Sequence, residues 1–519
     1  VQPGDIVICR VDLAMMHDSG GPRRLKPHLD ALGVRVWDPE RIVVVTDHYV
    51  PATDEGSAQI VRIARDWVRE QGIRHFYDEQ GICHVVAPQH GHLRPGMFAV
   101  GGDSHSCTGG AFGAYMFGIG ATEMLSVAVT GEIWLRVPHT IAMEWTGRLP
   151  AGVCAKDMML HMCTRFGMDG GQYEAVEFCG EAVQSLSMNE RMTLSNMATE
   201  LGTQAGLVAP DATTAQWLRD VGVPGDALHG MAQWRTDEGA PLLARHCMDA
   251  RSLAPQVSAP GSPAQAQDAA TFAHERLDIA YIGACTGAKL DDLRMAAQVF
   301  RGGRKTAAGV RLMVAPASAQ DQRQAAAEGV LQTLMDAGAE LLPNACGACA
   351  GYGANTFAPD TIAISTTARN FTGRMGAASS HVFLGSPYTV AASAVTGCIT
   401  DPRELLASTA TDTPGRCWVL GDNVNTDYLA PGRHMKYGID VIARHCLEDV
   451  EPRFAREVRA GDLLITGRNF GAGSSREQAV EVLRHLGVRC VVARSFAGLF
   501  YRNGFNLGLP LLLGPAAME

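Results

Sequence analysis

The chain has 519 residues, 46% of them hydrophobic and only 19% charged, and it carries a net charge of −10. Its length exceeds the ~150 residues of a typical domain, so we expect several hydrophobic cores. The acidic balance and the absence of Lys or Arg runs exclude a broad nucleic-acid-binding face, and no apolar stretch reaches the ~18 residues of a membrane span. Because no basic region followed by an apolar stretch opens the sequence, we expect a cytoplasmic protein.

Apolar β-branched runs alternate with helical patterns along the chain. Residues 41–45 predict a strand and residues 58–67 a helix. The pattern recurs as a predicted strand over 277–282, a helix over 289–300 and a strand over 311–314. Such alternation is typical of parallel sheets covered by helices, so the expected fold class is α/β with several doubly wound modules.

Two composition shifts divide the chain. A Pro-, Ser- and Ala-rich segment over residues 252–270 resembles a linker within the first part. A Ser-, Thr- and Pro-rich stretch precedes a new predicted strand over 417–420. We therefore expect a large part over residues 1–405, a linker over 406–414 and a second domain over 415–519.

A close pair of cysteines, Cys346 and Cys349, lies in a glycine-flanked loop after a predicted strand. This spacing alone is compatible with structural zinc, a redox pair or an iron–sulfur cluster. Cys285 lies in a similar strand-end loop 61 residues upstream (346 − 285) and is the expected third thiolate. Three protein thiolates on an iron–sulfur cluster would leave one iron open to substrate.

The cysteine loops resemble those of a known family. Cys285-Thr286, the following Asp-Asp-Leu and the CxxC-x-Gly segment are similar to the cluster signature of aconitases and isopropylmalate dehydratases, although Gly287 replaces the usual Asn. Ala-Cys-Ala around Cys349 likewise replaces Pro-Cys-Leu. The resemblance implies three doubly wound α/β/α modules, a C-terminal swivelling β/α domain and a 4Fe-4S cluster on the three cysteines.

Motifs near the N-terminus extend the resemblance. The His-Asp-x-Gly-Gly segment at residues 17–21, the Asp-His pair after the strand at 41–45 and the Asp-Ser-His segment at 103–105 all have family counterparts. Without the resemblance, the Asp47-His48 pair would be a surface turn pair, the Asp-Ser-His segment a capped turn and His84 a core histidine. The resemblance implies catalytic roles for Asp47, His48, His84, Asp103, His105 and Glu177, and substrate contacts for His17 and Ser104.

Fixed positive charge for an anionic substrate is expected in two places. Arg369 and Arg374 lie in a segment that resembles the family's carboxylate clamp. A Gly-rich loop over residues 471–477 resembles the swivelling domain, in which Ser474 would be the base and Ser475 and Arg476 would hold a carboxylate. Either serine could instead cap the helix that follows.

Residues 431–437 resemble the family's substrate-selecting loop. Arg433 is expected to bind a common carboxylate, and Lys436 stands where an isopropylmalate-like loop has an apolar residue. A cation there favours an additional anionic group. The candidate substrates are citrate, homocitrate, isopropylmalate and substituted malates.

The leading hypothesis is therefore an iron–sulfur hydro-lyase or isomerase acting on a small anionic hydroxyacid. The alternatives are a cluster-less RNA-binding regulator and a zinc or redox protein that uses Cys346 and Cys349 alone. Since both parts occur in one chain, a separate small subunit is not expected to be required. The C-terminal domain is expected to be short, ending soon after the segment at 503–510.

Overall fold

The computed structural model describes residues 1–409 and 416–514. It separates into two compact units, Val1–Leu406 and Ala407–Glu519. Residues 410–414 of the expected linker and residues 515–519 lie outside the described residues. Among the described helices, none is long and apolar enough to cross a membrane.

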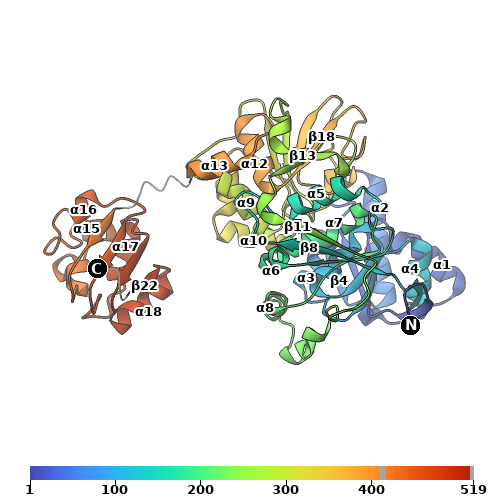
Figure 1. The fold of residues 1–519 in the computed structure, drawn as a ribbon, viewed down its shortest axis with the longest axis horizontal. Helices are drawn as coiled ribbons and strands as arrows, with labels where there is room; N and C mark the ends of the chain where they lie inside the picture. Colours follow the sequence, from blue (N-terminus) through green and yellow to red (C-terminus); the bar gives the residue numbers. More distant parts are fainter. Residues whose placement is uncertain (410–415, 515–519) are drawn as a thin grey trace. The chain divides into compact units, whose positions relative to one another are not determined.

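The first module is built on a five-stranded parallel sheet in the order β4-β3-β2-β5-β6. Strands β2 and β3 are buried on both faces, which explains their continuous apolar sequences. Helices α1, α2 and α4 pack on one face and α3 on the other, and α1 and α4 lie side by side in Figure 1. The strands are β2 (Leu13–His17), β3 (Ile42–Thr46), β4 (His75–Asp78), β5 (Phe98–Gly101) and β6 (Tyr115–Gly118), and the helices are α1 (Pro22–Leu32), α2 (Glu55–Gln71), α3 (Cys83–Gln89) and α4 (Ala121–Thr130).

An antiparallel ribbon, β1 (Ile6–Arg10) with β7 (Glu132–Arg136), closes this module. The second module follows, with a four-stranded parallel sheet in the order β10-β9-β8-β11. Its strands are β8 (Thr140–Thr146), β9 (Ala175–Cys179), β10 (Ala205–Val208) and β11 (Ala244–Asp249), and its helices are α5 (Ala155–Phe166), α6 (Glu181–Ser185), α7 (Met188–Met197) and α8 (Ala212–Asp220).

The third module contains a seven-stranded sheet in the order β13-β12-β18-β17-β14-β15-β16. Five strands run parallel. At one edge, β12 pairs antiparallel with β18, and β13 pairs antiparallel with β12. The strands are β12 (Gln256–Ser258), β13 (Ala266–Asp268), β14 (Ile279–Ile282), β15 (Arg311–Val314), β16 (Ala339–Leu341), β17 (Ile362–Ser365) and β18 (His381–Gly385). The helices are α9 (Leu290–Phe300), α10 (Ala319–Ala327), α11 (Val330–Asp336), α12 (Pro387–Thr396) and α13 (Pro402–Thr409).

The segment over residues 252–270 is not a linker, contrary to the expectation from its composition. It carries β12 and β13, and Val257 and Ala266 within it are buried. The backbone N–H of Gln256 donates to the Asp157 carboxylate at 2.8 Å. Pairing with β18 gives this Pro-rich stretch a place in the sheet that its own sequence does not indicate.

The second unit has its own parallel sheet, in the order β19-β20-β21-β22, and its own apolar core. The strands are β19 (Cys417–Val419), β20 (Leu463–Thr466), β21 (Cys490–Ala493) and β22 (Leu511–Leu513), and the helices are α14 (Thr426–Leu429), α15 (Ile439–Ala443), α16 (Phe454–Glu457), α17 (Gln478–His485) and α18 (Gly498–Leu507). Parallel sheets with helices thus build both units, and the α/β class expected from the sequence is confirmed.

Candidate active site

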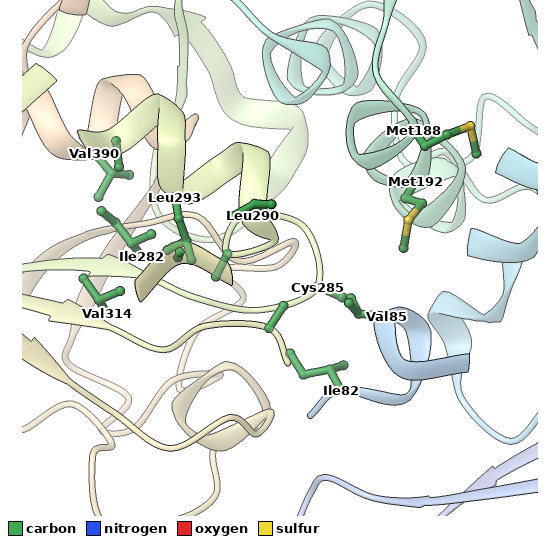
Figure 2. Close-up of a cluster of buried hydrophobic side chains, with 14 of the residues drawn as sticks. Ile82, Val85, Met188, Met192, Ile282, Cys285, Leu290, Leu293, Val314 and Val390 are labelled. Atoms are coloured by element: carbon green, nitrogen blue, oxygen red, sulfur yellow. The ribbon is translucent and has the colours of Figure 1, made fainter. Parts of the chain in front are cut away.

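Cys285 lies in the loop between β14 and α9. After β16, Cys346 directly precedes a 3-10 turn, Gly347–Ala350, and Cys349 lies within it. Ala284 takes a left-handed φ of 68°, which turns the chain sharply before Cys285. Figure 2 shows Cys285 beside Val85 of α3, and both belong to one buried apolar cluster. Burial, together with the charge of Cys349, raises the pKa of Cys285 to about 12. Thiolates here therefore need a cationic partner.

A second group of residues follows β3. The Asp18 carboxylate accepts the backbone N–H groups of Asp47, His48 and Tyr49 at 2.7–3.2 Å. Asp47 in turn lies 2.6 Å from Nδ1 of His48, and the His17 ring stacks on His48 with 4.1 Å between centroids. Although burial opposes both charges, the pair lowers the pKa of Asp47 to about 2 and raises that of His48 to about 9. The result is a carboxylate-oriented imidazolium.

A third group follows β5. Asp103 lies 2.8 Å from Nε2 of His84 and accepts the backbone N–H of His105 at 2.8 Å. Nε2 of His105 lies 3.0 Å from Oε1 of Glu200, and that same oxygen pairs with Nε of Arg369 at 2.7 Å. Although burial opposes its charge, the neighbouring histidines hold the pKa of Asp103 well below its usual range.

The cysteines and the two acid–histidine groups form one site. The Cys346 backbone N–H donates to the carbonyl oxygen of Asp47 at 2.8 Å, and Asn196 Nδ2 donates to Cys285 Sγ at 3.3 Å. The charge of Asp103 raises the pKa of all three cysteine thiols, although burial is the larger cause. The fold thus brings together three sulfurs, two acid–histidine groups and an arginine.

The two arginines of the expected clamp have different surroundings. Arg369 pairs with Glu200 and donates from Nη1 to Ser104 Oγ at 3.0 Å. Arg374 has a buried Nε that finds no hydrogen-bond partner among the described residues. Its charge lowers the pKa of Cys349, against the larger effect of burial. Arg374 is therefore the cation available to an added anion.

Glu177 does not reach this site, contrary to expectation. It lies in β9 and accepts a hydrogen bond from Thr236, beside a cavity lined by Tyr115 and Trp234. The buried carboxylate at the site is Glu200, which lies one helical turn after Asn196. The four-residue spacing of Asn196 and Glu200 places both on one side of the helical segment, but their surroundings in the sequence do not distinguish them from other polar residues there.

Two buried lysines that contact the Cys285–Thr286 segment were not predicted from the sequence. Lys156 Nζ donates to the carbonyls of Thr366 and Thr367 at 2.7 and 2.5 Å. Lys289 Nζ donates to the carbonyl of Cys285 at 2.9 Å and pairs with Asp292 at 2.7 Å. Neither residue belongs to a motif that marks it as part of a site.

In the second unit, the Gly-rich loop contacts the start of α14. The Ser474 backbone N–H donates to Thr426 Oγ1 at 3.0 Å, and the two hydroxyl oxygens lie 3.2 Å apart. Helix α17 begins at Gln478, its N-cap is Glu477 and no side chain caps it, so neither serine caps the helix. The Ser475 carbonyl accepts from Asn503 Nδ2 at 3.2 Å.

The three candidate substrate-binding cations of this unit differ in their pairing. Arg476 pairs with Asp427 and donates to the Ala430 carbonyl, and Arg433 pairs with Glu448. Lys436 lies over the Tyr437 ring, 5.2 Å from its centroid, and makes no ion pair with a described residue.

Models of the aconitase family (aconitate hydratase) match residues 2–275 and 264–397, and the aconitase C-terminal domain matches residues 448–514. The chain belongs to the aconitase family. It is 43% identical over 408 residues to a 3-isopropylmalate dehydratase large subunit 1 of Methanopyrus kandleri, covering 78% of this chain and 96% of the relative. A probable methanogen homoaconitase large subunit of Methanothermobacter thermautotrophicus is 40% identical over 409 residues, covering 78% and 94%. This aconitase-family chain is accordingly a hydro-lyase.

Solved structures give two further similarities. The chain of a 3-isopropylmalate dehydratase (leuD) of Methanocaldococcus jannaschii is 38% identical, covering 20% of this chain and 64% of that one, with a TM-score of 0.20. The holo-form of aconitase X of Thermococcus kodakaraensis is 13% identical, covering 70% and 84%, with a TM-score of 0.43. The prediction that a separate small subunit is not required is wrong, because the relatives that match the first unit are named as large subunits.

Proposed function

We propose that this chain dehydrates, and rehydrates, a hydroxy di- or tricarboxylic acid of the citrate, homocitrate, isopropylmalate or substituted-malate type. A 4Fe-4S cluster on Cys285, Cys346 and Cys349 would be its cofactor. The observation that carries the proposal is the meeting of three buried thiols with the Asp103 and Asp47 groups in one site.

The donor set fits a cluster better than a single zinc ion. Within the described residues, the three sulfurs do not form a group that lies within 4.8 Å of one another. Two thiolates on one zinc ion, at about 2.3 Å per bond, are at most ~4.6 Å apart. A cluster spans a wider set of sulfurs, and its iron compensates the buried negative charge. This favours a cluster over a single zinc ion bound by all three cysteines.

When bound, the cluster supplies an iron without a protein thiolate, which acts as a Lewis acid on the substrate hydroxyl. His48 is proposed to donate a proton to the departing hydroxyl, since Asp47 holds its Nδ1 and leaves the other ring nitrogen for the substrate. His17, stacked on His48, faces the same substrate. Asp103, His84, His105 and Glu200 form a hydrogen-bonded chain that orients the leaving water.

Substrate carboxylates are proposed to bind the cations with the fewest partners. Arg374 makes no ion pair with a described residue, whereas Arg369 and Ser104 are held in place by Glu200 and by each other. An unpaired guanidinium presents a planar fork to a carboxylate.

The second unit is proposed to supply Ser474 as the base and Ser475, Arg476 and Arg433 as carboxylate ligands. Lys436, which has no carboxylate partner among the described residues, favours a substrate with an additional anionic group. This supports a tricarboxylate or a similarly anionic malate over isopropylmalate.

The proposal is tested by anaerobic reconstitution with iron and sulfide, followed by assay of acid-labile sulfide and of unsaturated-product absorbance for each candidate acid. Bound sulfide together with turnover of one acid would support it. Zinc without labile sulfide would overturn it.

The substrate preference is tested with Lys436→Val, and Arg484→Val, which removes an exposed cation of α17, is the control. The Lys436 argument predicts that only Lys436→Val shifts kcat/KM towards the less anionic acid. An unchanged preference would reject it.

A further inference from the structure

Two fully buried ammonium groups lie below the Cys285 loop. Lys156 comes from α5 of the second module and is 1% exposed, and Lys289 lies just before α9 of the third module and is 0% exposed. Burying an ammonium group costs several kcal/mol unless charge or hydrogen bonds compensate it. Each lysine therefore requires a charge or hydrogen bonds that compensate its burial.

The compensation of the two lysines differs. Lys289 forms an ion pair with the buried Asp292 carboxylate at 2.7 Å, so this pair adds no net charge. Lys156 donates only to neutral oxygens, namely the carbonyls of Thr366 and Thr367 and, at 3.4 Å, the hydroxyl of Thr286. No carboxylate of a described residue lies within the 4.0 Å ion-pair limit of its Nζ. Lys156 is thus a buried cation without a local counter-ion.

The acceptors of Lys156 connect it to the cysteine loop and to the arginine segment. Thr286 follows Cys285 directly, and its hydroxyl also donates to the Thr366 carbonyl at 2.8 Å. Thr367 lies two residues before Arg369. Burial lowers the pKa of Lys156 to about 8, and the charged forms of Cys154, Asp292 and Cys349 oppose this effect. The hydrogen bond from Lys156 Nζ to Thr286 Oγ1 ties the ammonium group to the loop that carries Cys285.

We propose that Lys156 is a positioning residue that acts as the internal counter-cation of the three-cysteine centre and raises the reduction potential of the cluster bound there. This inference rests on the proposed function, because it concerns the cluster on Cys285, Cys346 and Cys349. A positive charge close to a cluster stabilises its more negative, reduced form. The same charge stabilises the thiolates that the buried site would otherwise disfavour.

The test compares the midpoint potential of the anaerobically reconstituted holoenzyme, followed by electron paramagnetic resonance, in the wild type and two neutral variants. Lys156→Met removes the charge, and Lys156→Gln removes it while keeping two N–H donors for the carbonyls. We expect both variants to lower the potential enough to change the oxidised-to-reduced ratio about tenfold, which corresponds to about 59 mV for one electron.

The matched control is the double variant Lys289→Met with Asp292→Asn. It removes an ammonium group equally close to the Cys285 loop but leaves the net charge unchanged, so we expect its potential to remain that of the wild type. A purely structural role for Lys156 predicts altered stability with an unaltered potential.

The outcomes separate this inference from the proposed function. Failure of the wild type to bind a cluster overturns both. A wild-type cluster whose potential is the same in Lys156→Met and Lys156→Gln overturns only the inference, and so does a control that shifts the potential as much as they do. If neither neutral variant folds, as judged by circular dichroism, Lys156 is a structural residue and the inference is wrong.

Discussion

The backbone N–H of Cys346 donates to the carbonyl oxygen of Asp47 at 2.8 Å, which joins the CxxC loop of the third module to the strand-end turn of the first. The carboxylate of the same Asp47 orients His48. The proposed cluster ligand Cys346 and the turn that carries the proposed proton donor His48 are therefore joined by one backbone hydrogen bond. Changes that disturb this turn are expected to affect both cofactor binding and proton transfer.

Asp18 holds that turn through three backbone hydrogen bonds. In Asp18→Asn, one carboxylate oxygen becomes an NH₂ group that cannot accept, and a buried N–H loses its partner. We expect the free energy of unfolding to fall by about 1–3 kcal/mol, measured by urea denaturation of the apo-protein. Asp30→Asn, at an exposed position on α1, is the control and should leave the value unchanged. Equal stability of the two variants would contradict the prediction.

Glu200→Gln is expected to lower kcat by roughly 10²–10⁴-fold, the range of a lost acid–base group. The amide oxygen can still contact both His105 and Arg369, but it lacks the negative charge that pairs with Arg369 and favours the protonated form of His105. Glu177→Gln is the matched control, since Glu177 faces a different cavity, and its kcat should remain that of the wild type. Loss of activity in the control instead of in Glu200→Gln would restore the original assignment.

Asn196→Ala removes the N–H donor to Cys285 Sγ without changing a ligand. Loss of a partner that orients a metal ligand usually lowers metal affinity by 10–100-fold. We therefore expect faster loss of labile sulfide under chelator challenge, measured on the anaerobically reconstituted protein. Asn189→Ala, in the same helix α7, should lose sulfide at the wild-type rate. Indistinguishable rates for all three proteins would show that the contact has no role in retention.

His92 makes stability depend on pH. Burial, together with the charges of His75, His90 and Arg94, lowers its pKa to about 4. An unfolded histidine binds a proton near pH 6.5, so between pH 6.5 and about 4 the unfolded chain binds more protons than the folded one. Stability contributed by His92 is therefore complete above pH 6.5 and is lost as the pH falls to about 4.

We expect the free energy of unfolding to fall by about 2 kcal/mol because of His92. This is less than the full difference in its pKa would give, because water screens a half-buried ring. Urea midpoints at pH 7 and pH 4.5 measure it. His92→Gln keeps a polar partner for the Tyr77 hydroxyl, which lies 2.6 Å from the imidazole, and should show a smaller pH difference than the wild type. An equal pH difference in the variant would assign the effect to other groups.

Sequence patterns predicted local features well. The strand over 311–314 and the helix over 289–300 follow from a few adjacent apolar residues, and the structure has them as β15 and α9. The cysteine and Asp-His segments were found because each is a short run with a recognisable chemistry. Their assembly at the ends of parallel strands follows from the α/β class.

Contacts between distant residues could not be predicted in this way. His105 and Glu200 are 95 positions apart, so nothing close to either residue indicates their hydrogen bond. Glu177 was preferred although its strand directs it to another cavity. The Pro-rich stretch at 252–270 becomes sheet only by pairing with β18, more than 100 residues later. Lys156 likewise gains its role from carbonyls of the third module.

The order of strands in the third sheet has a consequence for biosynthesis. Strand β14, which leads into Cys285, lies between β15 and β17, and β17 follows Cys346 and Cys349 in the chain. A ribosome must therefore translate both later cysteines, and then β17, before the strand ahead of Cys285 has its two neighbours. On the proposed function, insertion of the cluster is accordingly expected to be a late event that awaits nearly the whole first unit.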